Sequence, residues 1–419
     1  MKEFIIAFIL IAIPLFVYFF LIKTSSSAKP KEKEETKKEV EMAKVEESSK
    51  PEQKEKTVNP KDYLIKTFKD TKDLRRCYIH HNGHVVIYSD DKRISFAYIK
   101  YIGGKGQKII SKSVDRDLIS DIAYSEKSRK IAVTLKNSKN ILFYSLVDDN
   151  GKTKLQQLPQ SIETKRKFEI KEVVISNDGN YVSTSGTEQD TEIQIYNIES
   201  MKLIDKLETG GINNLQIKMS QDDNDILVST FLNDISVIHF DKKEKFNNQN
   251  LGYETIVSII RKKSISGIKE KIACFEFSNE LQFFVVSTDS KTIKIMQNYG
   301  NISESKVFSE FKTDFRSDTV SLYVNSFFNG KIEGYVALVD GTDIVICDTD
   351  GNVVMRMEKA HDNEIIALKL VKVNLEENEE APKDSFINEQ FEGAKDKEGK
   401  IALISASKDG RVKIWNLKL

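Results

Sequence analysis

Residues 401–417 read IALISASKDGRVKIWNL, and this stretch shows how the body of the chain is built. An apolar-rich segment leads into the polar turn Lys408-Asp409-Gly410, and a second apolar-rich segment follows and ends at Leu417. Alternation of apolar and polar residues on both sides of an Asp-Gly turn is typical of two paired β-strands. The stretch therefore predicts an antiparallel hairpin.

The same pattern returns elsewhere in the chain. Residues 175–186 (ISNDGNYVSTSG) with 191–198 (TEIQIYNI) form one copy, and residues 277–296 (FSNELQFFVVSTDSKTIKIM) form another. The first strand of each unit is expected to begin near Cys77, Leu118, Ile170, Asn213, Ile272, Thr319 and Glu364, in steps of 41 to 59 residues. Four-stranded units at a period of roughly 40 to 50 residues are typical of propeller blades. We predict an all-β fold, a seven-bladed β-propeller over residues 60–419.

The last unit resembles the WD-repeat family. Ala360-His361 stands where that family has Gly-His. Ser405, Asp409 and Trp415 stand at its Ser/Thr, Asp and Trp positions, and Asn416 replaces the usual Asp. In such a quartet the Asp bonds the His, the His bonds the hydroxyl, and the hydroxyl accepts from the indole N–H, so four buried polar groups satisfy one another. We predict a structural tetrad and no catalytic residues here, because the hydroxyl would be buried and no oxyanion donor is evident.

Only four residues follow Trp415, so the last blade lacks a fourth strand of its own. A bare sheet edge needs a cover. The segment containing Tyr63, Leu64, Ile65 and Phe68 precedes the first blade and has the composition of an orphan strand. We predict that this segment pairs with the strand that holds Trp415 and closes the ring.

The N-terminus predicts a membrane anchor. Residues 4–22 carry no charge and would span roughly 28 Å as a helix, which matches the hydrocarbon core of a bilayer. We therefore expect a transmembrane signal-anchor over residues 1–23 that contacts lipid through residues 4–22. A cleavable signal peptide is the alternative, with Ser26 and Ala28 as small residues near a cleavage point. Lysines concentrate after the segment, which predicts a propeller in the cytosol.

Residues 24–59 are expected to be a Lys/Glu-rich spacer. Nine Lys and nine Glu lie between Lys29 and Lys56, with no aromatic residue, so this segment cannot bury a core. It is either a solvated coil or one charge-laced helix, because Glu and Lys repeatedly fall four residues apart.

Bulk composition names no partner. The chain has 64 Lys and Arg against 64 Asp and Glu, so its net charge favours neither nucleic acid nor an acidic surface, and we expect no nucleic-acid partner. Cys77, Cys274 and Cys347 lie far apart with no CxxC pair, which indicates a reducing compartment and no disulfide framework.

A C-x2-H-H-x2-H cluster holds Cys77, His80, His81 and His84, ligand types that bind zinc. Asn82-Gly83 in its middle is a hairpin turn signal, so neighbouring side chains should point to opposite faces. We therefore expect no metal site in this chain.

Three short segments have weaker signals. The loop Gly103–Gly106 lacks the spacing of a phosphate-binding loop and no helix is expected after it. The basic segments Arg75-Arg76 and Arg261–Lys263 lack interleaved aromatic residues, so they are poor candidates for RNA contact.

An acidic insertion at 374–399 interrupts the last blade between its first and second strands. It holds nine acidic residues against three Lys, with Phe386, Ile387 and Phe391 as bulky apolar residues. Such an insertion is either a docking motif that folds on binding, with these three residues as anchors, or a tolerated loop.

The leading functional prediction is a membrane-anchored protein-binding scaffold without a cofactor. The layout of membrane helix, charged spacer and propeller resembles the family of transducin beta-like protein 2, WD-repeat proteins of the endoplasmic-reticulum membrane. That resemblance implies an endoplasmic-reticulum location and, as a partner, the stress kinase that phosphorylates a translation initiation factor. The alternatives are an exchange factor for a small coat-assembly GTPase and a propeller hydrolase. A hydrolase needs carboxylates or His that converge on the central channel, and no repeated inward-facing Asp, Glu or His is expected.

Overall fold

The computed structural model describes residues 56–69, 73–81, 83–99, 108–114, 118–149, 152–187, 190–210, 213–247, 252–265, 267–373 and 400–419. The predicted membrane segment, most of the predicted spacer, the Gly103–Gly106 loop and the insertion at 374–399 lie outside these residues. Within these ranges, no helix has the length and apolar character of a membrane span.

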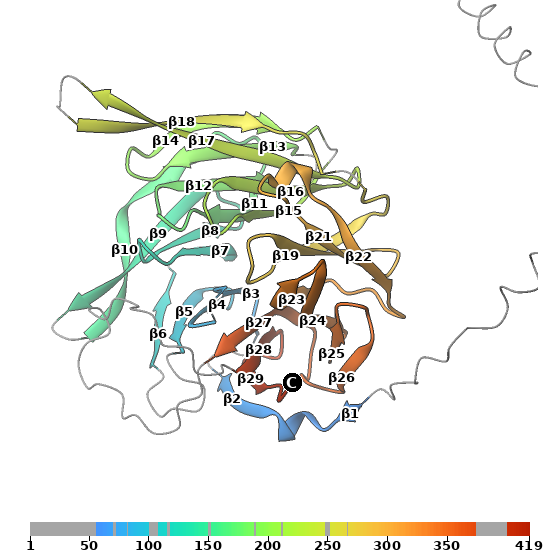
Figure 1. Ribbon diagram of the computed structural model, residues 1–419. Helices are drawn as coiled ribbons and strands as arrows, with labels where there is room; N and C mark the ends of the chain where they lie inside the picture. The colour runs from blue at the N-terminus through green and yellow to red at the C-terminus, as the bar shows by residue number, and fades with distance from the viewer. Residues whose placement is uncertain are drawn as a thin grey trace, which may run out of the picture. The chain divides into compact units, whose positions relative to one another are not determined.

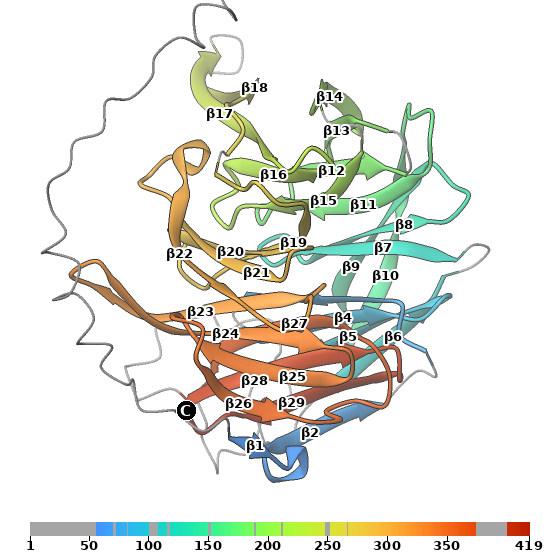
Figure 2. The same cartoon turned by 90° about the vertical axis from the view of Figure 1, so that its right-hand side faces the viewer.

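Seven antiparallel sheets are arranged as blades around one axis, which confirms the predicted seven-bladed propeller (Figures 1 and 2). Each first strand packs against the first strand of the next blade, and the first strand of blade 7 packs against that of blade 1. The ring is therefore continuous.

The strands fall into four concentric sets, numbered here from blade 1 to blade 7. The first, axial strands are β3 (Arg76–Ile79), β7 (Ile119–Ser125), β11 (Ile170–Ile175), β15 (Asn214–Met219), β19 (Ile272–Phe277), β23 (Val320–Phe328) and β27 (Ile365–Val373). The second strands are β4 (Val85–Ser89), β8 (Lys130–Leu135), β12 (Tyr181–Gly186), β16 (Asp225–Thr230), β20 (Phe283–Thr288), β24 (Lys331–Asp340) and β28 (Lys400–Ser407). The third strands are β5 (Arg93–Tyr98), β9 (Asn140–Asp149), β13 (Glu192–Asn197), β17 (Ile235–Asn247), β21 (Thr292–Gln297), β25 (Asp343–Asp348) and β29 (Arg411–Asn416). The outer strands are β6 (Lys108–Ser113), β10 (Lys152–Glu163), β14 (Lys202–Glu208), β18 (Gly252–Arg261), β22 (Lys306–Lys312), β26 (Val353–Met357) and, in blade 7, β2 (Leu64–Lys69).

Each axial strand begins within one residue of its predicted start. The two longest predicted steps belong to blades 2 and 4, where the third and fourth strands are extended. The β9–β10 and β17–β18 hairpins project beyond the other blades (Figure 1). Extra length in these hairpins lengthens the period without changing the number of blades.

Apolar side chains fill the spaces between blades. One cluster lies at each of the seven blade interfaces formed by the described residues, and the blade 7–1 interface contains Phe68, Tyr88 and Ile404. Because both faces of a blade are covered, second strands such as β12 and β16 are buried along their whole length. Their sequences, YVSTSG and DILVST, combine apolar residues with small hydroxyl residues that are also buried.

An N-terminal strand completes blade 7. Strand β2 pairs antiparallel with β29, with Leu64 opposite Trp415 and Phe68 opposite Val412. The backbone N–H of Asn416 also donates to the carbonyl of Tyr63 at 2.9 Å. Ile65 packs with Phe68 in the blade 7–1 cluster. Because β2 and β29 pair in blade 7, both ends of the propeller lie in one blade.

A shorter N-terminal strand, β1 (Thr57–Val58), lies ahead of the expected domain start at residue 60. It pairs in parallel with β26 of blade 6, with Val58 opposite Met357. Two short 3₁₀ helices, η1 (Pro60–Asp62) and η2 (Ile302–Glu304), complete the described elements.

Candidate functional site

The structure brings the four tetrad residues of blade 7 together. His361 Nδ1 lies 2.9 Å from Asp409 Oδ2, and His361 Nε2 lies 2.8 Å from Ser405 Oγ. The indole N–H of Trp415 donates to the same Ser405 oxygen at 2.8 Å. Ser405 and Trp415 are buried, so the hydroxyl is enclosed by its two partners. The arrangement joins the loop after blade 6, which holds His361, to three parts of blade 7: strand β28, the β28–β29 turn and strand β29.

Protonation of the tetrad follows from its burial. Burial lowers the pKa of His361, although the Asp409 carboxylate opposes this effect. Burial alone would raise the pKa of Asp409, but His361 and the backbone N–H groups of Asp362 and Arg411 together outweigh this and lower the pKa to about 2. A neutral imidazole beside a carboxylate is therefore the stable state near neutral pH.

Blade 3 contains a related network that the sequence patterns did not reveal, in which the residue at the Trp place bonds Lys165 and Gln194 and not the strand hydroxyl. Arg166 occupies the place of the His, and its Nε donates to Thr184 Oγ1 at 3.0 Å while Nη1 donates to Asp190 Oδ2 at 2.7 Å. The Tyr196 hydroxyl, at the Trp place on the third strand, accepts from the Lys165 N–H at 3.3 Å. Two blades thus use the same positions with different side chains.

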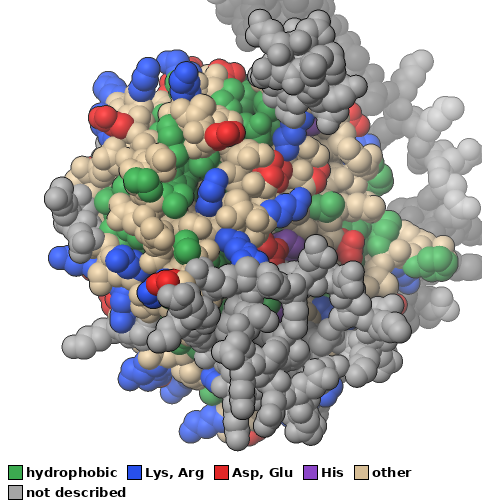
Figure 3. Space-filling model, turned by 90° about the vertical axis from the view of Figure 1, so that its left-hand side faces the viewer, with side chains coloured by type: hydrophobic (Ala, Val, Ile, Leu, Met, Phe, Trp, Pro, Cys, Tyr) green, Lys and Arg blue, Asp and Glu red, His purple; other side chains and the backbone are tan. Residues whose placement is uncertain are grey.

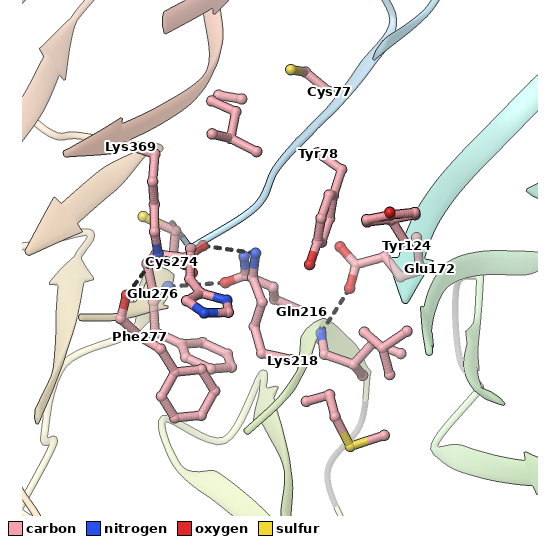
Figure 4. Close-up of a pocket in the computed structure, with 18 of the residues that line it drawn as sticks. Cys77, Tyr78, Tyr124, Glu172, Gln216, Lys218, Cys274, Glu276, Phe277 and Lys369 are labelled. Atoms are coloured by element: carbon pink, nitrogen blue, oxygen red, sulfur yellow. Dashed lines mark hydrogen bonds and ion pairs between the residues drawn. The ribbon is translucent and has the colours of Figure 1, made fainter. Parts of the chain in front are cut away.

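The axial strands enclose a central cavity of about 280 Å³ (Figure 4). Glu276 lies between two lysines from other blades: Lys218 Nζ is 2.8 Å from Oε2 and Lys369 Nζ is 3.1 Å from Oε1. Lys369 also donates to the carbonyl of Phe277 at 2.9 Å. Burial opposes ionisation of Glu276, but the two lysines outweigh it and lower the pKa of Glu276 to about 2.

Four successive blades, blades 2 to 5, are joined by the same side-chain contact. In blades 2, 3 and 4, the third residue of the axial strand accepts a hydrogen bond from the backbone N–H of the fourth residue in the next blade's axial strand. Asp121 accepts from Val173 at 2.9 Å, Glu172 from Ile217 at 2.7 Å, and Gln216 from Phe275 at 2.9 Å. Adjacent axial strands share no ladder, so these side chains satisfy N–H groups that would otherwise be unpaired.

The carboxyl groups on this contact line are difficult to ionise. Burial raises the pKa of Glu172 to about 7, and the charge of Asp121 adds to the rise. Burial also raises the pKa of Asp121, against the effect of Arg76. The cavity therefore joins Glu276, whose pKa is lowered by two lysines, to a pair of carboxyl groups whose pKa values are raised by burial.

The expectation that no repeated Asp, Glu or His faces the channel is wrong, because Asp121 and Glu172 occupy the same position in successive axial strands. Asp121, Glu172, Glu276 and His81 all line the cavity. A β-bulge interrupts strand pairing just before Asp121 and Glu172, and one extra residue moves the following side chain to the other face. Simple alternation from the strand start therefore assigns these side chains to the wrong side. Charged and His side chains also gather near the middle of the face drawn in Figure 3.

The side chains of the Cys-His cluster of blade 1 do not converge on one point, although the rings of His80 and His81 lie 4.0 Å apart. His80 is fully buried, with Nε2 3.1 Å from Glu126 Oε2. His81 faces the cavity, and His84 Nδ1 lies 3.2 Å from the carbonyl of Ile99. In the part of the chain that the structure describes, no three His, Cys, Asp or Glu side chains form a group that would hold a metal ion.

Both basic segments make contacts inside the protein. Arg75 pairs with Asp73 and Asp91, at 3.0 and 3.2 Å. Arg261 donates to the carbonyl of Glu208 at 3.0 Å and to that of Thr209. The predicted docking residues Phe386, Ile387 and Phe391 lie outside the described residues.

An apolar patch lies at one end of blades 5 and 6, and we call Leu281, Tyr299, Phe327 and Phe328 the blade 5–6 patch. Their exposed fractions are 50%, 68%, 41% and 75%. The Phe327 ring packs 5.2 Å from that of Phe283, which is buried, so the patch is supported by the core. Leu281 and Tyr299 lie on connections and Phe327 and Phe328 lie at the end of β23, all at the same end of their blades. No pattern of periodicity marks them, because they lie in turns and at strand ends.

No known protein family matches this chain, and no curated protein matches its sequence. The likeness to WD-repeat proteins is thus a resemblance carried by the blade 7 tetrad and by the seven-bladed fold.

Proposed function

We propose that this protein is a protein-binding scaffold that presents a propeller at a membrane surface. The blade 5–6 patch is the observation that carries the proposal. Four large apolar side chains are exposed at this end of blades 5 and 6, three of them aromatic. Contiguous exposed apolar surface on a soluble fold commonly marks a binding site.

The chemistry of the patch suits another protein. Aromatic side chains bury large areas on binding and dominate the energetic centres of protein interfaces. Phe327 is held by Phe283 and Phe308, with ring centroids 5.2 and 6.0 Å away, so little side-chain freedom is lost when a partner covers it. The patch therefore has the features of a preorganised anchor.

The cellular setting is proposed from the sequence. Residues 4–22 would anchor the chain in the endoplasmic-reticulum membrane, and the lysines that follow would keep the propeller in the cytosol. The resemblance in layout to the transducin beta-like protein 2 family makes a stress-response kinase the first partner to test. These assignments are independent of the geometry of the patch.

A site-specific cross-linking experiment in intact microsomes tests the proposal. A photoreactive phenylalanine replaces Phe328 in the full-length chain, and the same residue replaces Ile109 of blade 1, which is 37% exposed, as the matched control. We expect a discrete protein adduct from position 328 that disappears when Tyr299→Ser and Phe327→Ser are added. Protease added without detergent should digest the adduct.

Two results would contradict the proposal. Equal adducts from positions 328 and 109 would show that the patch is not a preferred contact. Protection from protease in the absence of detergent would place the propeller in the lumen. Circular dichroism of the Phe328 variants should show an unchanged thermal midpoint, which separates loss of binding from loss of fold.

A further inference from the structure

The turn between β16 and β17 lies beside the connection between β18 and β19 in blade 4. Asn233 Nδ2 donates to the carbonyl of Lys269 at 3.4 Å, and Ile235 pairs with Ile265 through an isolated β-bridge. Lys271 Nζ lies 5.3 Å from the centroid of the Phe231 ring. These contacts hold the two loops together as one unit, which we call the blade 4 tip.

Two adjacent apolar side chains project from this tip. Phe231 and Leu232 are 46% and 53% exposed, while Ile235, Ile265 and Ile268 beneath them are buried. Asn233 has a φ of +64°, the left-handed conformation that ends the turn. The apolar pair is thus held outward on a rigid turn above a packed core.

The tip also has an excess of positive charge. Residues 261–271 contain Arg261, Lys262, Lys263, Lys269 and Lys271 against one carboxylate, Glu270, and the β16–β17 turn adds one more, Asp234. Glu270 lies 3.4 Å from Lys294, and Lys271 lies 3.0 Å from Asp289. Among the described residues, no carboxylate forms an ion pair with Lys263 or Lys269, and both lysines are exposed.

We propose that the blade 4 tip binds the anionic surface of a lipid bilayer. Anionic headgroups attract Lys side chains near the membrane surface, and Phe and Leu gain free energy when they enter the boundary between headgroups and acyl chains. The tip combines both requirements within a few residues of each other. A bilayer suits an outward turn, whereas peptides generally bind in grooves or along sheet edges.

This inference goes beyond the proposed scaffold function and does not require residues 4–22 to cross a membrane. If they do, the linker from Ile22 to Lys56 spans at most about 120 Å when fully extended, which does not prevent the tip from reaching the same bilayer. Lipid contact would then hold the ring in a fixed orientation.

Fluorescence at the tip tests the proposal with the full-length chain. An environment-sensitive dye is attached through Leu232→Cys, and vesicles of phosphatidylcholine alone are compared with vesicles that also contain phosphatidylserine. The chain without the introduced cysteine gives the background from Cys77, which is partly accessible. Tyr299→Cys, on a connection at the opposite end of its blade, is the matched labelling control.

We expect a blue shift at position 232 with anionic vesicles, weakened by salt, and none at position 299. Lys263→Glu with Lys269→Glu should weaken apparent binding at least about tenfold, since each basic residue near an anionic surface contributes roughly fivefold. Lys306→Glu with Lys331→Glu, two exposed lysines at the opposite end of blades 5 and 6, should leave the shift unchanged.

The proposal is overturned by an equal shift with neutral vesicles, by a shift that survives Lys263→Glu with Lys269→Glu, or by an equal shift at position 299. A shift produced by poly-glutamate and not by anionic vesicles would also overturn it, and would assign the tip to an acidic protein partner.

Discussion

The Ser405 hydroxyl shows how one group determines which atoms of the tetrad donate hydrogen bonds and which accept them. Its oxygen accepts from Trp415 Nε1–H, so its own proton is free to donate to His361 Nε2. The remaining imidazole proton is then on Nδ1 and is donated to Asp409. Every polar atom on this path has a partner, and this is the condition under which burial of polar groups is tolerated.

Removal of the Trp415 indole should make blade 7 less stable. We expect Trp415→Ala to lower the free energy of unfolding by roughly 3 to 5 kcal/mol, because a buried aromatic is lost and Ser405 loses a partner. Chemical denaturation followed by circular dichroism measures this change. Tyr299→Ala is the control, and its 68% exposure predicts a change within about 0.5 kcal/mol. Equal free energies of unfolding for the two variants would contradict a structural role of the tetrad.

The axial strand is the element in which side chains of adjacent blades meet. Asp121, Glu172 and Gln216 occupy the same place in three successive strands and make the same contact to the next blade. Gln216 makes this contact without a charge, which shows that the contact needs an acceptor oxygen but not a carboxylate. Glu172 retains a carboxylate whose pKa is raised to about 7 by burial and by Asp121.

The raised pKa predicts how stability changes with pH. A group with a higher pKa in the folded state contributes stability at low pH that is lost as the pH rises, here between about 4.5 and 7. Glu172→Gln retains the acceptor for Ile217 N–H and removes the titration. We expect this variant to gain roughly 1 to 3 kcal/mol relative to the native chain when the pH is changed from 5 to 8.

Denaturation midpoints at pH 5 and pH 8 measure this difference. Glu163→Gln, an exposed change on β10, is the control and should show no such gain. A constant difference between Glu172→Gln and the native chain at both pH values would show that Glu172 does not titrate in this window.

The whole ring depends on a strand from the other end of the propeller. Strand β2 fills the fourth place of blade 7, and Phe68 is packed at the blade 7–1 interface. A closed ring leaves no gap between its first and last blades, whereas loss of β2 would expose β29 as an edge.

Deletion of residues 60–68 should therefore open the propeller. We expect a lower thermal midpoint and concentration-dependent association, measured by calorimetry and by light scattering. Thr67→Asp, an exposed change on the same strand, should leave both unchanged. A monomeric deletion variant with the native midpoint would show that β2 does not support the ring.

Local pattern was enough to predict the order of the strands, the number of blades and the pairing of β2. Turn residues and apolar alternation are short-range properties, so the axial strands were located to within one residue. His361, Ser405, Asp409 and Trp415 could be identified together because their residue types and spacing match a known pattern.

Only the tertiary structure decided what lies around the axis and on the surface. The bulge before Glu172 changes which face its side chain takes, and pairing between strands, not composition, creates that bulge. Arg166 joins Thr184 and Asp190 because the folding of blade 3 brings the loop before β11 beside β12 and the turn that follows β12. The blade 5–6 patch and the blade 4 tip exist for the same reason: exposure depends on which neighbours the closed ring places beside a turn, and a linear sequence does not contain those neighbours.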